Sequence, residues 1–109
     1  MTTRGNILKQ AYETINGARQ DTYGNPEDSF QIIANYWNTY LGITNIKAYD
    51  VSIMMTLLKI ARIKGQKHHE DNYIDAAGYI GIACDLKSSE KEVIWVDLNY
   101  LPGFLYSSQ

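Results

Sequence analysis

The sequence has 109 residues, enough for one domain with a modest hydrophobic core. The formal net charge of −2 gives no electrostatic reason to expect nucleic acid as a partner. No apolar run approaches the roughly 20 residues of a membrane-spanning helix, and the N-terminus lacks the apolar run of a signal peptide. Cys84 is the single cysteine, so an internal disulfide is excluded, and we expect it to be a small core residue on a helix. We therefore expect a cytoplasmic protein with no membrane partner.

The first two segments that the sequence predicts to be helical have recognisable ends. Apolar residues recur from Ile7 to Ile15 at the spacing of one helix face, and Gly17 weakens the end of that helix. Asn25 is a good N-cap for the second helix, which Pro26 begins and Gly42 ends. The expected buried face of this second helix consists of Phe30, Ile33, Trp37 and Leu41.

The third and fourth predicted helices form a hairpin. The third begins near Tyr49 or Asp50 and ends at Gly65, and a short polar loop leads from it to the fourth helix. Two helices joined by so short a loop should lie side by side and antiparallel. Gly78 in the fourth helix costs about 1 kcal/mol relative to alanine, so we expect another helix or a ligand to approach it closely. The expected apolar stripe of the third helix is Val51, Met54, Met55, Leu58 and Ala61.

The fold class that these patterns predict is all-α: a four-helix bundle domain over residues 1–92, followed by a tail over residues 93–109. The tail opens with the β-branched and aromatic run VIWV and contains the turn signal LPGF. We expect this tail to be irregular or β-like and to pack on the bundle or on a partner chain.

Two basic and two acidic residues form the candidate site. Lys59 and Arg62 share a face of the third helix, and Asp71 and Asp75 share a face of the fourth. Three interpretations stay open: ion pairs between the two helices, a phosphate clamp formed by the bases, or a metal site formed by the acids. Phosphate is well matched to arginine, which can bind it with two parallel hydrogen bonds.

A magnesium site needs more than the acidic pair. Asp71 and Asp75 could hold Mg²⁺ together with a third carboxylate such as Glu27, although no cofactor is required by the sequence. His69 precedes the fourth helix and could cap it or contact an anion, whereas adjacent histidines do not favour zinc.

Three motifs together resemble a known family. The series R-x-x-x-YG-x-PE-x-x-F, DV-x-x-MM-x-x-x-K-x-x-R and HED-x-x-x-D-x-x-GY is similar to small phage and prophage proteins of unknown function. These in turn look like distant members of the all-α nucleotide pyrophosphohydrolase superfamily, the MazG-like group. The matching residues are Arg19, Tyr23, Gly24, Pro26, Glu27, Phe30, Asp50, Val51, Met54, Met55, Lys59, Arg62, His69, Glu70, Asp71, Asp75, Gly78 and Tyr79.

This resemblance implies a MazG-like bundle, a dimer or higher homo-oligomer, and a pocket for nucleotide phosphates. Active members of the superfamily carry two pairs of acids that hold Mg²⁺, but this chain has Lys59 and Arg62 where the first pair is expected. Replacing acids with bases removes metal affinity and adds phosphate affinity.

We therefore expect a phage-type protein that binds a nucleotide or nucleotide-derived signal at a helix seam or subunit interface, and that could sequester it. The alternatives are a Mg²⁺-dependent pyrophosphohydrolase and a ligand-free protein that binds a host factor. The expected ligand-binding residues are Lys59, Arg62, Asp71, Asp75, Tyr23, Tyr79, His69 and Arg19.

Overall fold

The computed structural model describes the backbone of residues 2–17 and 24–98, with side chains up to residue 89. Within these ranges the chain forms helices and no strand: α1 (Thr3–Asn16), α3 (Pro26–Leu41), α4 (Ala48–Gly65) and α5 (Glu70–Leu98). The predicted all-α class is therefore confirmed. Within the described residues, no helix has both the length and the apolar character needed to cross a bilayer.

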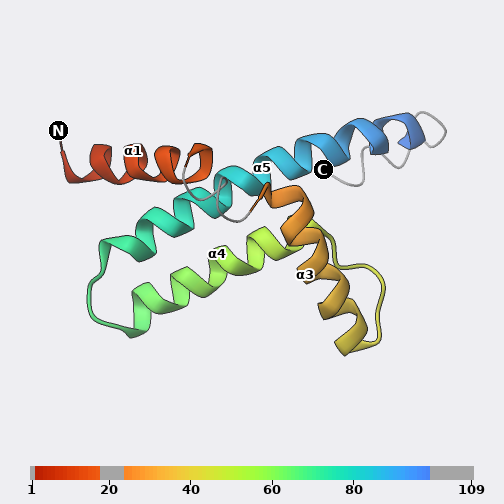
Figure 1. Ribbon diagram of the computed structural model, residues 1–109, viewed down its shortest axis with the longest axis horizontal. Coiled ribbons are helices and arrows are strands. Elements are labelled where there is room, and N and C mark those ends of the chain that lie inside the picture. The colour runs from red at the N-terminus through yellow and green to blue at the C-terminus, as the bar shows by residue number, and fades with distance from the viewer. Residues whose placement is uncertain (1, 18–23, 99–109) are drawn as a thin grey trace.

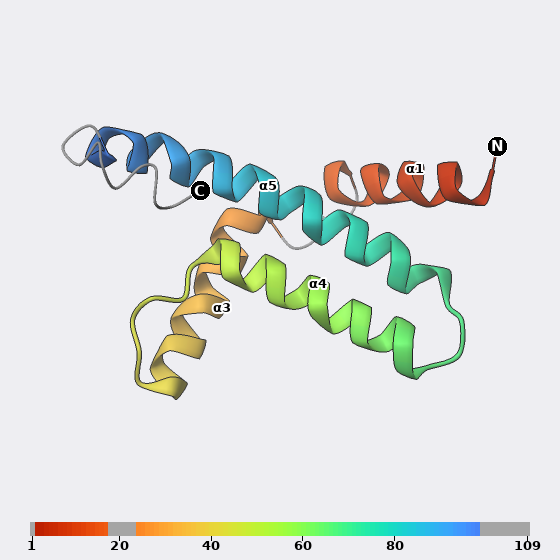
Figure 2. The same ribbon diagram turned by 180° about the vertical axis from the view of Figure 1, so that it is seen from behind.

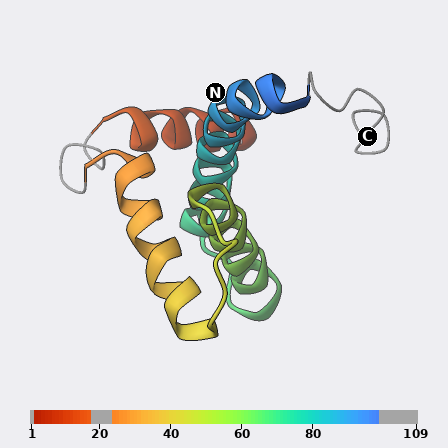
Figure 3. The same ribbon diagram turned by 90° about the vertical axis from the view of Figure 1, so that its right-hand side faces the viewer.

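The long helix α5 organises the structure. Helix α4 runs antiparallel along one side of α5, as the short loop predicts, and α1 lies along another side (Figures 1 and 2). Helix α3 packs mainly on α4 and crosses its N-terminal end at a steep angle (Figures 1 and 3). The chain thus builds its core outward from the α4–α5 hairpin.

Helix α3 begins and ends at the residues that the sequence predicts. The Asn25 side chain accepts a hydrogen bond from the backbone N–H of Asp28 at 2.9 Å, and Pro26 occupies the first turn of α3. Gly42 ends α3 in the left-handed conformation at φ 69°, which glycine adopts without steric cost. The Asn38 amide then fixes the connector, because it both donates to and accepts from the backbone of Ile46, each at 2.9 Å.

Small side chains let the helices approach closely. The side chains of Val51 and Ser52 on α4 are fully buried, and the Ser52 hydroxyl donates a 2.6 Å hydrogen bond to the carbonyl of Tyr79 on α5. A carbonyl in the middle of a helix can accept this second bond because it has two lone pairs. The buried hydrophobic residues in the described part are Ala11, Ala34, Ala48, Val51, Ile74, Ala83 and Leu86.

Replacing Ser52 with alanine should lower the free energy of unfolding by about 0.5–1.5 kcal/mol, because the partly buried interhelical hydrogen bond is lost. Thr39→Ala is the matched control, since Thr39 is exposed and its hydroxyl bonds only to Asn35 within α3. Urea unfolding followed by circular dichroism measures both variants. Equal effects at the two positions would show that the α4–α5 bond contributes nothing.

Three features differ from the sequence-based expectations. Helix α5 continues to Leu98, so residues 93–98 are helical rather than irregular or β-like, and residues 99–109 lie outside the described part. Valine, isoleucine and tryptophan lower helix propensity by only tenths of a kcal/mol, so an established helix can continue through them. Cys84 is exposed rather than in the core. The expected apolar faces are only partly buried, because Leu41 of α3 and Met54 and Leu58 of α4 are 56%, 45% and 42% exposed.

Candidate functional site

An ion pair joins the two helices of the hairpin at the candidate site. Lys59 Nζ lies 2.9 Å from Asp75 Oδ2, and the two side chains are only 13% and 21% exposed. The pairing follows from the antiparallel arrangement, which places the middle of α4 opposite the second turn of α5. Screening by water is weak at such exposure, so this pair holds its geometry better than a surface ion pair would.

A cavity of about 250 Å³ opens beside Asp75, where α1, α3 and α5 meet. Its wall is mostly apolar, and among the described residues that line it Asp75 is the only acidic or basic one. Gly78 supports this junction, because a Cβ at that position would lie 3.0 Å from Ile15 Cγ2 of α1. The predicted close approach to Gly78 is therefore confirmed, and the approaching element is α1. The cavity is lined by Thr14, Ile15, Gly24, Pro26, Ser29, Phe30, Ile33, Ile74, Asp75, Gly78, Tyr79 and Ile82.

Two aromatic rings stand together in the cavity wall. The ring centroids of Phe30 on α3 and Tyr79 on α5 are 6.1 Å apart, with an interplanar angle of 39°. Tilted aromatic pairs at this separation attract one another. Both rings are half-buried, so they stabilise the junction and still present ring surface to the cavity.

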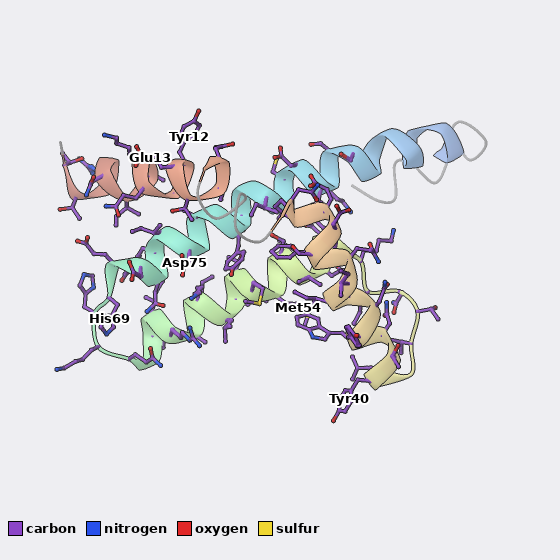
Figure 4. All side chains as sticks on the ribbon, in the orientation of Figure 1. Tyr12, Glu13, Tyr40, Met54, His69 and Asp75 are labelled. Atoms are coloured by element: carbon purple, nitrogen blue, oxygen red, sulfur yellow. The ribbon has the colours of Figure 1, made fainter. Side chains whose placement is uncertain are left out.

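The other predicted site residues in the described part lie outside the cavity lining. Arg62 and Asp71 are exposed, and each has no ion-pair partner among the described residues. His69 lies in the α4–α5 loop, just before α5 begins and outside the cavity lining (Figure 4). Glu27 is exposed in the first turn of α3, next to Pro26 in the cavity wall.

The remaining predictions for this site are a metal and two further side chains. Among the described residues, no group of three or more His, Cys, Asp or Glu side chains is placed to hold a metal ion. Asp71, Asp75 and Glu27 remain the sequence-based candidates for Mg²⁺. Arg19 and Tyr23 lie outside the described residues.

Sequence reasoning missed part of the cavity. Phe30 was predicted only as a buried residue of its helix, and Thr14 and Ser29 were not singled out. No local pattern distinguishes a residue that lines a cavity from one that fills a core. The sequence feature that pointed to the cavity was Gly78. A glycine inside a helix indicated that another group packs closely against it, but not whether that group is a helix or a ligand.

Comparison with known proteins places the chain in a family. A family model described as "Domain of unknown function (DUF6378)" matches residues 6–87. This chain belongs to that family. The matched range contains every described residue that lines the cavity, as well as both residues of the Lys59–Asp75 pair.

Two relatives of this chain are phage proteins. It is 38% identical over 86 residues to the Gene 55 protein of Mycobacterium phage L5, covering 79% of this chain and 55% of that protein. It is 43% identical over 75 residues to the Gene 55 protein of Mycobacterium phage D29, covering 69% and 49%. The chain thus spans about half the length of these curated relatives. No solved structure matches it significantly. The predicted similarity to phage proteins is confirmed, whereas the MazG-like resemblance stays a prediction.

Proposed function

We propose that this protein binds a nucleotide, or a signal derived from one, at the cavity between α1, α3 and α5 and that binding does not require hydrolysis. The observation that carries the proposal is that one cavity wall contains both the Phe30–Tyr79 ring pair and the Asp75 carboxylate, which Lys59 fixes in place. A volume of about 250 Å³ is slightly below the roughly 300–1,000 Å³ of drug-sized ligand sites. It suits one flat ring system, with sugar and phosphate outside.

The ring surfaces and the carboxylate would recognise different parts of the ligand. Phe30 and Tyr79 offer apolar ring surface for a base, and stacking on aromatic side chains contributes about 1–3 kcal/mol per base in single-stranded nucleic-acid complexes. Asp75 uses Oδ2 for Lys59, and an ionised carboxylate has further lone pairs available. Those lone pairs can accept from base N–H groups or from sugar hydroxyls.

The phosphate would lie on the basic side of the hairpin. Arg62 follows Lys59 by one helical turn on α4 and is exposed, with no ion pair among the described residues. Its guanidinium can therefore bind phosphate oxygens without first breaking a contact. Lys59 holds Asp75 in place and adds positive charge next to it.

A thermal-shift screen tests this proposal with nucleosides and with linear and cyclic nucleotides, each in Mg²⁺ and in EDTA. A ligand at a hundredfold excess over its Kd should stabilise the protein by about 2.7 kcal/mol and raise Tm by several degrees. Asp75→Asn should weaken binding by about tenfold or more, because the ionised acceptor is lost. Asp85→Asn, an exposed acid on the same helix, is the control.

Arg62→Ala separates phosphate recognition from base recognition. This variant should weaken nucleotide binding and leave binding of the matching nucleoside unchanged. Chromatography of the bound ligand completes the test, since intact ligand supports a binding protein. A ligand that is cleaved in Mg²⁺ and preserved in EDTA would replace the proposal with the pyrophosphohydrolase. If no nucleotide changed the Tm, both the binding protein and the pyrophosphohydrolase would be contradicted.

A further inference from the structure

Helix α4 is buried on one side and leaves apolar residues exposed on the opposite side. Val51, Ser52 and Thr56 face the interior and are buried. Met54, Leu57 and Leu58 are 45%, 57% and 42% exposed, and Ala61 is also exposed. Monomeric proteins rarely leave a continuous apolar surface of this kind in water.

The exposed residues follow a coiled-coil pattern. Met54, Leu57 and Ala61 recur at intervals of three and four residues, which is the spacing of a seam between two packed helices. The same pattern continues to Asp50 at one end and to Lys64 at the other. We call the stripe Asp50, Met54, Leu57, Ala61 and Lys64 the α4 seam. Figure 1 shows that α5 runs along one side of α4 and that α3 crosses only its N-terminal end.

The charges at the two ends make the α4 seam complementary to itself in one direction. Asp50 and Lys64 are each seven residues, about 10 Å, from Leu57. In an antiparallel pair of seams centred on Leu57, each Asp50 faces Lys64 of the second copy. A parallel pair would instead place like charges opposite each other. Neither Asp50 nor Lys64 has an ion-pair partner among the described residues, and the half-buried Asp50 uses Oδ2 to accept a 2.9 Å hydrogen bond from the backbone N–H of Lys47.

We infer that the α4 seam is the interface for a second copy of this chain, packed antiparallel about a two-fold axis near Leu57. One Asp50–Lys64 pair closes each end of the interface. A two-fold interface uses the same surface on both subunits, and the reversal of charge along the seam meets that requirement. This interface goes beyond ligand binding, and it gives the expected homo-oligomer a defined surface.

Sedimentation velocity of the full chain over a range of concentrations tests the interface. The wild-type protein should be a dimer. Leu57→Glu should be a monomer, because it places two carboxylates together at the two-fold axis. Glu13→Gln, an exposed change on α1, is the control and should remain dimeric. Circular dichroism shows that each variant is folded. A wild-type monomer, or a Leu57→Glu dimer as tight as wild type, would overturn the inference.

Charge reversal tests the antiparallel direction. Asp50→Lys and Lys64→Asp should each weaken the dimer by about tenfold or more, because like charges then meet at both ends. Mixing the two variants should restore a dimer, since each chain then meets the opposite charge of the other. Lys67→Asp, in the loop beyond α4, should leave dimerisation unchanged. Failure of the mixture to recover would overturn the proposed direction.

Discussion

Lys59→Met is expected to lower the free energy of unfolding by about 2 kcal/mol. Methionine keeps the straight apolar chain of lysine but removes the ammonium, so Asp75 is left without its partner in a site where it is only 21% exposed. Removing one member of a fully buried pair costs roughly 3–5 kcal/mol, and the remaining access to water reduces that cost here. Urea unfolding of the variant and the wild type measures the loss.

The double variant Lys59→Met with Asp75→Leu distinguishes charge from packing. With both charges gone, no group is left to be desolvated, and most of the lost stability should return. Lys9→Met, an exposed position on α1, is the control and should change stability by less than about 0.5 kcal/mol. If the single and double variants were equally unstable, the lysine would stabilise the hairpin through its apolar stem rather than its charge.

The sequence could predict that Lys59 and Asp75 lie close together, because their contact depends on a short loop and on helical spacing. A short loop makes α4 and α5 antiparallel neighbours, and the helical period fixes which side chains face the seam. The helix ends were predicted for the same reason: Asn25 and Gly42 act on backbone groups within a few residues of themselves.

The orientation of α4 was harder to predict, because its largest apolar residues do not mark its buried side. The periodicity favoured the face with Met54 and Leu58, yet two polar residues, Ser52 and Thr56, occupy the buried face. Their hydroxyls are satisfied by the carbonyls of Tyr79 and Ser52, so their burial leaves no unpaired group. Hydrophobic patterning treats serine and threonine as exposed residues. It therefore identified only part of the buried face of α4.

The cavity could not be predicted because it depends on where α1 lies. Its walls come from three helices, and no sequence spacing connects Ile15 on α1 to Phe30 on α3 or Tyr79 on α5. Only the cost of a glycine inside α5 indicated that another group approaches there. The packing of Gly78 against α1 is thus the contact on which the shape of the proposed binding site depends.

Two glycines on α5 test that contact against the same side chain. A Cβ at Gly81 would lie 3.6 Å from Ile15 Cδ1, an ordinary contact, whereas one at Gly78 would lie 3.0 Å from Ile15 Cγ2. Gly81→Ala should therefore stabilise the protein by about 0.5–1 kcal/mol through helix propensity. Gly78→Ala should lose that gain, because Cγ2 belongs to the β-branched part of isoleucine, whose χ1 is restricted.

Gly78→Leu should have the larger effect, lowering the free energy of unfolding by about 1–3 kcal/mol through overpacking and displacing α1 from α5. Because Gly78 lines the cavity, the same variant should also abolish any ligand-induced thermal shift. Ile15→Ala combined with Gly78→Ala provides the test of mechanism. If Ile15 is the group that clashes, Gly78→Ala should be less harmful in the Ile15→Ala background than in the wild type. Equal effects of Gly78→Ala in both backgrounds would mean that α1 does not pack on α5 through this pair.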